Sequence, residues 1–285
     1  MAQFTSFDGL PISYSYRSGD AGYSLLALHG WTANSTFLQL LEDGLPSVPV
    51  YRWDARCHGK SGVDPAATVE KMALDLRWFI DTIYEDDRPL IVMGHSMGAL
   101  TLWESLRLYG DSRIAAVCIV DQSPKLVTDD DWQLGIYGDY PLERNARMRR
   151  EFVRDLGEGV ILLSTEGLNL PYNERFHADP QSFFRHKRRF SAAQAQGLVN
   201  IWDSLVEADY RDVLPQIRVP ALLVYGGESQ YYTAETADYV QAQIAGSQLL
   251  RLPKGDHSPF MQQPAKFCAA LDAFAQQLVQ PAKRL

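Results

Sequence analysis

A serine between two glycines stands where an apolar segment meets a helical one. The apolar run Leu90–Met93 is followed by Gly-His-Ser-Met-Gly at 94–98, and a helical pattern begins at Ala99. A strand–turn–helix setting holds such a serine in a sharp turn, so that its hydroxyl projects above the sheet and can attack a carbonyl carbon. The glycines leave room for the turn, and the helix N-terminus favours developing negative charge. Ser96 is therefore the candidate nucleophile.

A nucleophilic serine needs a base, and the chain offers six histidines, at positions 29, 58, 95, 177, 186 and 257. His257 alone lies late in the chain, between the apolar run Leu249–Leu252 and the helical segment Pro264–Val279. A histidine in the loop after the last strand can swing its imidazole over the serine and accept the hydroxyl proton. We therefore predict that His257 is the general base.

The segments that must position these residues alternate between apolar runs and helical patterns. The apolar runs are Tyr23–Leu28, Val48–Trp53, Leu90–Met93, Ile114–Val120, Ala221–Tyr225 and Gln248–Leu252. The helical patterns are Thr36–Leu41, Thr68–Tyr84, Ala99–Leu108, Ala234–Ile244 and Pro264–Val279. Such runs are typical of strands buried on both faces, and their alternation with helices predicts a mostly parallel sheet. An alternating segment around Asp8-Gly9 precedes them and predicts a hairpin.

One stretch interrupts this alternation. Residues 125–208 contain no convincing strand and are helical, with many arginines and aromatic residues. We predict an α/β fold whose core, 1–124 and 209–285, has helices on both faces of the sheet, with 125–208 as an inserted helical cap. Two basic clusters of the cap, 144–150 and 185–189, could receive an anionic carrier such as coenzyme A or acyl carrier protein. Such a run is more often the solvated face of a helix.

This combination resembles the α/β-hydrolase superfamily over nearly the whole chain. The segment 26–31, which ends in His29-Gly30-Trp31, is similar to the family segment in which the amide after His-Gly is an oxyanion donor. The resemblance implies that the backbone N–H groups of Trp31 and Met97 form the oxyanion hole. Residues 53–62 are similar to a structural loop of the family, with Cys57 where glycine is usual, and they are assigned no chemistry.

A serine–histidine pair of this kind needs a carboxylate that orients the histidine, and this third residue of the triad is harder to place. Most members of the superfamily carry it after the strand that follows the cap, where this chain has Ser229 and Gln230. Glu228 is adjacent, but its register is off by one or two residues. Asp121 follows the apolar run before the cap, and 120–124 is similar to a motif of small bacterial esterases that carry the acid at this earlier position. We predict Asp121 as the orienting acid, with Glu228 as the alternative.

These residues predict a serine hydrolase that cleaves carboxylic esters, or thioesters, through an acyl-enzyme on Ser96. A lactonase, a C–C bond hydrolase or a perhydrolase would use the same residues, and acyl transfer also stays open. An alternative of another class is a non-catalytic ligand receptor on this fold, although such a receptor typically loses the nucleophile or the base. No group of His, Cys and carboxylates has metal-ligand spacing, so we expect no cofactor.

The bulk composition bears on partners and compartment. The net charge of −8 argues against nucleic acid. No window of 18 apolar residues is present, so no membrane span is expected. Met1–Leu10 lacks the pattern of a secretory signal, and the three cysteines have no Cys-x-x-Cys spacing. We expect a reduced, cytoplasmic enzyme that acts on a small-molecule ester or acyl thioester.

Overall fold

An antiparallel hairpin opens the chain in the computed structural model, which describes residues 1–279. Strands β1 (Ala2–Thr5) and β2 (Pro11–Arg17) pair antiparallel, and the turn between them holds Gly9 at a φ of +85°. Only glycine adopts this region without strain, which explains the Asp8-Gly9 sequence. β2 then pairs antiparallel with the edge of the parallel strands. The hairpin predicted from the sequence is confirmed.

The remaining strands form the parallel part of an eight-stranded sheet with the order β1-β2-β4-β3-β5-β6-β7-β8. They are β3 (Ser24–Leu28), β4 (Val50–Trp53), β5 (Leu90–His95), β6 (Ala116–Val120), β7 (Ala221–Gly226) and β8 (Gln248–Leu252). Every residue of β3 to β6 is buried. Burial on both faces explains why these segments are continuously apolar and do not alternate.

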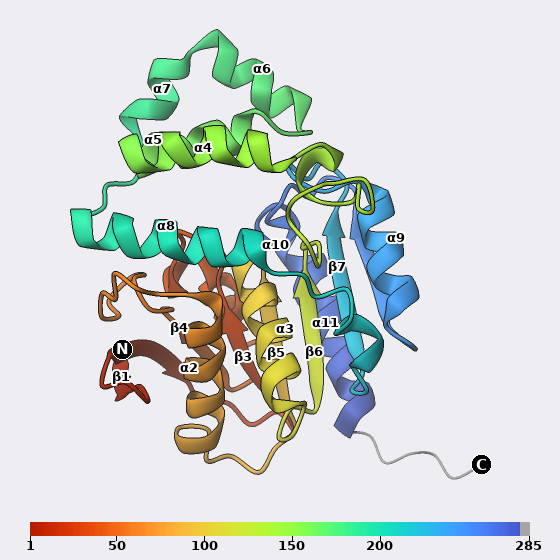
Figure 1. The fold of residues 1–285 in the computed structure, drawn as a ribbon. Coiled ribbons are helices and arrows are strands. Elements are labelled where there is room, and N and C mark those ends of the chain that lie inside the picture. Colours follow the sequence, from red (N-terminus) through yellow and green to blue (C-terminus); the bar gives the residue numbers. More distant parts are fainter. Residues whose placement is uncertain (280–285) are drawn as a thin grey trace.

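Helices cover both faces of the sheet (Figure 1). The helices α1 (Leu40–Gly44) and α11 (Pro264–Val279) pack on one face. The helices α2 (Val69–Thr82), α3 (Met97–Tyr109) and α9 (Ala234–Gln243) pack on the other. Successive strand residues enter opposite cores, as Val92 and Met93 do, because side chains alternate across a strand. The predicted fold class, with helices on both faces of a mostly parallel sheet, is confirmed.

One predicted helix is divided in two. Instead of a helix over Thr36–Leu41, the chain forms a 3₁₀ helix η1 (Ser35–Leu38) followed by α1 (Leu40–Gly44). The Asn34 side chain caps η1 by accepting from the Thr36 N–H. The second helix ends before Leu45, since the residue before a proline disfavours helical backbone.

The segment between β6 and β7 contributes no strand to the sheet in the described chain. Its elements are η2 (Ile136–Gly138), α4 (Leu142–Arg154), α5 (Leu156–Thr165), α6 (Leu170–Ala178), α7 (Pro180–Arg185), α8 (Ala192–Glu207) and η3 (Leu214–Gln216). Figure 1 shows α4 to α8 above the carboxyl ends of the strands. A bridge between Lys125 and Asp209 holds the ends of the helical segment side by side. The division at 125–208 stays a prediction, and 280–285 of the predicted core lie outside the described residues.

Candidate active site

Ser96 occupies the turn between β5 and α3 in a strained backbone conformation. Its φ is 54° and its ψ is −121°, a combination that a non-glycine residue keeps only where its surroundings enforce it. A Cβ on Gly94 would lie 2.6 Å from the Ala99 Cα, and a Cβ on Gly98 would lie 2.4 Å from the Leu28 carbonyl oxygen. Any larger residue at either position would therefore open the turn.

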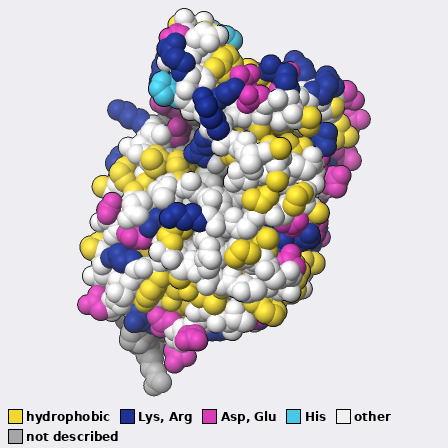
Figure 2. All heavy atoms as spheres, turned by 90° about the vertical axis from the view of Figure 1, so that its left-hand side faces the viewer, with side chains coloured by type: hydrophobic (Ala, Val, Ile, Leu, Met, Phe, Trp, Pro, Cys, Tyr) yellow, Lys and Arg dark blue, Asp and Glu magenta, His cyan; other side chains and the backbone are white. Residues whose placement is uncertain are grey.

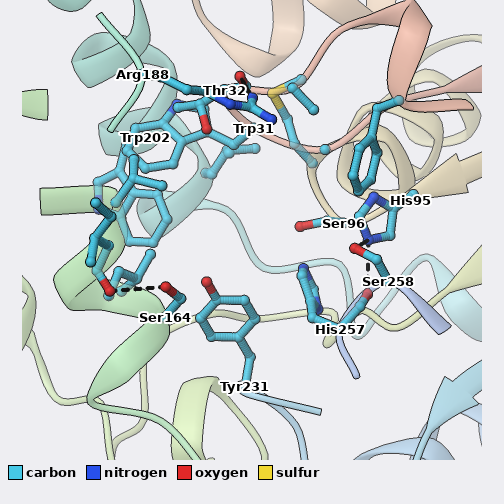
Figure 3. A pocket seen from close by; sticks show the side chains of 18 of the residues that line it. Trp31, Thr32, His95, Ser96, Ser164, Arg188, Trp202, Tyr231, His257 and Ser258 are labelled. Atoms are coloured by element: carbon cyan, nitrogen blue, oxygen red, sulfur yellow. Dashed lines mark hydrogen bonds between the residues drawn. The ribbon is translucent and has the colours of Figure 1, made fainter. Parts of the chain in front are cut away.

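The Ser96 side chain faces a cavity of about 320 Å³ that His257 also lines. Figure 3 shows both side chains pointing into this space, with Trp31 and Tyr231 on its walls. The helical segment 125–208 supplies many of the other lining residues, and most of these are apolar: Val160, Ile161, Leu163, Phe190, Trp202 and Leu205. A mostly apolar cavity with a few polar groups at one end is typical of a small-molecule site.

The carboxylate of Asp121 lies beside His257. Asp121 directly follows β6, is fully buried, and accepts from His257 Nδ1 through Oδ2 at 2.7 Å. The Gly226 N–H donates to its Oδ1 at 2.9 Å, and the Ser229 hydroxyl donates to its Oδ2 at 2.6 Å. These bonds satisfy a buried carboxylate and hold the proton of His257 on Nδ1. The Nε2 atom is left free to accept a proton.

The Ser96 hydroxyl makes no hydrogen bond to His257 within residues 1–279. Catalytic hydrogen bonds are often long before the substrate binds and shorten in the complex. The two side chains nevertheless share one cavity (Figure 3). The geometry therefore brings together the three predicted residues Ser96, His257 and Asp121 at the carboxyl ends of β5, β8 and β6.

The surroundings of Glu228, the alternative acid, do not support that role. Glu228 is exposed, and its carboxylate makes no hydrogen bond to His257 in the part of the chain that the structure describes. Its uncharged neighbours contact the site instead: Ser229 bonds to Asp121, and Gln230 Oε1 accepts from the His257 N–H at 2.8 Å. Sequence reasoning missed both roles. The available signal was a pair of hydrogen-bonding residues where the superfamily usually has its acid.

The peptide bond between Gly30 and Trp31 is held in one orientation. Its carbonyl accepts from His29 Nδ1 at 2.8 Å and from the Ala33 N–H at 3.1 Å. Since a trans peptide is planar, the Trp31 N–H points away from these donors. Neither the Trp31 nor the Met97 N–H donates to an acceptor within the described chain. Two unpaired amides beside a nucleophile can bind an oxyanion.

His29 has a structural role beside the predicted oxyanion donor. Its Nε2 accepts from the Ala55 N–H at 3.0 Å, so the proton must lie on Nδ1, which faces the Gly30 carbonyl. Burial lowers the pKa of His29 to about 4. The ring is therefore neutral at pH 7 and keeps this arrangement.

His95, which directly precedes Ser96, is buried, and its side chain links two loops. Its Nε2 donates to the His257 carbonyl at 2.8 Å, and burial, reinforced by the nearby His257, lowers the pKa of His95. His58 is also buried, and its Nε2 accepts from the Thr32 N–H at 3.0 Å. These two histidines hold loops in place, which leaves His257 as the histidine that lies beside a carboxylate in the cavity.

Buried polar contacts hold the loop at 53–62 in place. Arg56 is fully buried and forms a two-point ion pair with Asp75, with both nitrogen–oxygen distances at 2.7 Å. Cys57 has a φ of 65°, a conformation that favours glycine. This explains why glycine is usual at that position of the superfamily loop.

Most cations of the two basic clusters are paired with carboxylates. The pairs join Arg144 and Arg147 to Glu166, Arg149 to Asp203, Arg185 to Asp179, and Lys187 to Asp155 and Glu158. Arg150, Arg188 and Arg189 form no ion pair with another described residue. Figure 2 shows Lys and Arg side chains gathered where the upper helices meet the body of the molecule. The clusters are therefore largely neutralised.

Residues 25–270 match the model of the alpha/beta hydrolase family. The chain belongs to this family. Across 262 residues it is 24% identical to a pimeloyl-[acyl-carrier protein] methyl ester esterase of Neisseria meningitidis, covering 90% of this chain and 94% of that protein. It is also 24% identical over 231 residues to 3-oxoadipate enol-lactonase 1 of Acinetobacter baylyi, covering 80% of this chain and 79% of the lactonase.

Solved structures agree with the fold. An esterase from Exiguobacterium antarcticum superposes with a TM-score of 0.78 at 20% identity, covering 96% of this alpha/beta hydrolase and 98% of the esterase. A bromoperoxidase from Bacillus anthracis superposes with a TM-score of 0.77 at 18% identity, covering 96% of this chain and 99% of the bromoperoxidase. The family and the relatives confirm the predicted recognition and the prediction of an esterase-type hydrolase.

Two kinds of feature are absent from the described residues. Every helix within residues 1–279 is too short or too polar to span a lipid bilayer. No group of three or more His, Cys, Asp or Glu side chains in that range could hold a metal ion.

Proposed function

We propose that this alpha/beta hydrolase is a serine carboxylesterase in which Ser96 is the nucleophile, His257 the general base and Asp121 the orienting acid. The observation that carries the proposal is the 2.7 Å hydrogen bond between Asp121 Oδ2 and His257 Nδ1, on the wall of the cavity that Ser96 faces. A buried carboxylate at this distance fixes the imidazole tautomer and stabilises the imidazolium that forms during proton transfer.

The reaction proceeds through an acyl-enzyme. Ser96 Oγ attacks the ester carbonyl while His257 Nε2 takes the hydroxyl proton. The Trp31 and Met97 amides donate to the oxyanion of the tetrahedral intermediate. The intermediate collapses, and the alcohol leaves with the proton from His257. A water molecule, deprotonated by His257, then attacks the acyl carbon and frees Ser96.

Residues 125–208 act as the cap over this site. The apolar side chains that they contribute to the cavity, such as Val160, Ile161 and Trp202, would take up the apolar part of an ester. Desolvating an apolar chain there is favourable by about 0.8 kcal/mol for each buried CH₂. Chain length should therefore affect the KM of a series of esters.

A lactone is a second candidate substrate, because an enol-lactonase is among the relatives and a cyclic ester reacts through the same steps. A carrier-linked ester is a third candidate, because other relatives act on an acyl-carrier protein ester and a second groove adjoins the cavity. A C–C bond hydrolase or a perhydrolase would use the same triad. All three cysteines are buried and unpaired, which supports a cytoplasmic location.

A burst of p-nitrophenol from p-nitrophenyl esters of graded length tests this function. Acyl-enzyme formation predicts a burst close to one equivalent of enzyme when deacylation is slower than acylation. Ser96→Ala should abolish both the burst and the steady-state release. If Ser96→Ala keeps wild-type turnover, the proposed nucleophile is wrong. If no ester in the series is hydrolysed by the folded wild type, the carboxylesterase proposal fails and the receptor alternative gains support.

A further inference from the structure

One cation on the wall of the catalytic cavity has no acidic partner among residues 1–279. Arg188 lies between α7 and α8 and lines the cavity that holds Ser96 and His257. It also lines the adjoining outer groove, together with Thr32 and Arg189. Figure 3 shows its side chain on the wall beside Trp31 and Thr32. Arg188 therefore stands where the cavity meets the groove.

The backbone around Arg188 is fixed. A Cβ on Gly157 of α5 would lie 2.2 Å from the Arg188 carbonyl oxygen, so the two segments pack closely. The preceding residue, Lys187, is anchored by Asp155 and by Glu158, the latter at 2.7 Å. A guanidinium on an anchored segment loses less conformational entropy when it binds a ligand.

The charge of Arg188 is uncompensated, in contrast to that of Lys187. Its guanidinium donates through Nη1 to the Thr32 carbonyl, a neutral acceptor, and it forms no ion pair with any other described residue. The residue is open to solvent at the cavity mouth, while partial desolvation of the guanidinium lowers the pKa of Arg188. A guanidinium has five N–H donors, so several remain for a ligand.

We propose that Arg188 binds an anionic group of the substrate, a carboxylate or a phosphate, and thereby selects esters that carry a negative charge away from the scissile bond. Charge-assisted bonds from a guanidinium fork to a carboxylate or a phosphate are among the strongest hydrogen bonds in proteins. Asp43 also lines the outer groove but does not neutralise Arg188. The inference rests on the proposed function, because it assigns a substrate class to the Ser96 site.

Two matched substrate pairs test the inference and separate the two sources of the anion. Monomethyl adipate and methyl hexanoate differ by a terminal carboxylate. The thioesters hexanoyl-4′-phosphopantetheine and hexanoylpantetheine differ by the phosphate of the carrier arm. The measured quantity is the ratio of kcat/KM for the charged substrate to kcat/KM for its neutral counterpart. A ratio cancels any general effect of a variant on the Thr32 loop.

In the wild type, the ratio should exceed one for at least one pair. Arg188→Gln should lower it about 10- to 100-fold, mainly through the KM of the charged substrate, and Arg188→Lys should lower it less. Arg150→Gln is the control, because Arg150 is an exposed, unpaired cap arginine that lines neither cavity nor groove. It should leave both ratios unchanged. A fall confined to the first pair assigns a carboxylate, and a fall confined to the second assigns a phosphate.

If both ratios are the same in Arg188→Gln and in the wild type, the inference about Arg188 is overturned. The proposed function still holds in that case, provided that hydrolysis depends on Ser96. The wild type provides a test that does not depend on folding of the variant, since a preference for the neutral substrate in both pairs also overturns the inference. Failure of the folded wild type to hydrolyse any of the four substrates would overturn the inference and the proposed function together.

Discussion

The Ser229 hydroxyl donates to the Asp121 oxygen that also accepts from His257. Oδ2 thus receives two short hydrogen bonds, at 2.6 and 2.7 Å, from residues of two different loops. The serine at the position where the superfamily usually carries its acid therefore donates to Asp121, the acid that we propose. In the proposed triad, the Ser229 hydroxyl, and not the Glu228 carboxylate, contacts the group that orients His257.

The first prediction concerns the acid. Asp121→Asn keeps the shape of the side chain but removes the charge that stabilises the imidazolium, and the amide can hold the wrong tautomer of His257. The expected loss in kcat is roughly 10²- to 10⁴-fold. Glu228→Gln serves as the control and should cost less than about tenfold. Steady-state kinetics with one ester decide the matter: a nearly silent Asp121→Asn, or a larger loss in Glu228→Gln, would contradict the assignment.

The second prediction concerns Ser229. Ser229→Ala removes one hydrogen bond from Asp121 and leaves the bond between Asp121 and His257 in place. A net hydrogen bond contributes about 0.5–1.5 kcal/mol, so kcat should fall roughly 2- to 12-fold with little change in KM. In the Asp121→Asn background, Ser229→Ala should lower kcat less, because the carboxylate to which Ser229 donates is gone. Equal effects in both backgrounds would show that Ser229 acts independently of Asp121.

The third prediction concerns the orientation of the oxyanion donor. His29→Ala removes the donor that holds the Gly30 carbonyl at 2.8 Å, so the Gly30–Trp31 peptide can rotate. An oxyanion donor contributes about 10²- to 10³-fold to kcat, and a partly disordered one should cost about 10- to 100-fold. A boronic acid that mimics the tetrahedral intermediate should lose affinity in parallel with kcat. If kcat falls while boronate affinity is unchanged, His29 does not act through the oxyanion hole.

The fourth prediction concerns pH and stability. Burial lowers the pKa of His29 from 6.5 to about 4, so between these values the unfolded chain binds more protons than the folded one. The neutral His29 therefore makes its full contribution to the free energy of unfolding above about pH 6.5, and this contribution is lost as the pH falls towards 4. His58 and His95, whose pKa values burial also lowers, act in the same direction.

Urea denaturation at pH 7 and pH 5 measures this dependence. The wild type should lose more free energy of unfolding between the two pH values than His29→Gln does, since glutamine does not titrate. His177→Gln is a control at an exposed histidine and should follow the wild type. The same pH dependence in His29→Gln and the wild type would contradict the assigned cause.

Local sequence predicted those parts of the fold that local physics determines. Gly9, Gly94 and Gly98 stand where a positive φ or a close approach excludes a side chain, and the buried strands could be predicted from their apolar runs. The contact of Ser229 with Asp121 joins residues 108 positions apart. It depends on which strands are neighbours in the sheet, and no local pattern encodes that order.

The same limit applies to His29 and to the arginine pairs of residues 125–208. The His29 bond to Gly30 depends on the ring tautomer, which the distant Ala55 amide fixes. The pairing of the cap arginines depends on how α4 and α8 pack, as the Arg149–Asp203 pair illustrates. Sequence alone could identify the basic clusters but not which of their charges lack a partner.

Active-site labelling is the most direct test of Ser96 as the nucleophile. The wild type is treated with a fluorophosphonate, digested, and mapped by tandem mass spectrometry, with Ser96→Ala and His257→Ala treated in parallel. The proposed triad predicts one phosphonylated residue, Ser96, with no labelling of Ser96→Ala and labelling slowed by orders of magnitude in His257→Ala. Labelling of a different serine in the wild type, or undiminished labelling of Ser96→Ala, would contradict it.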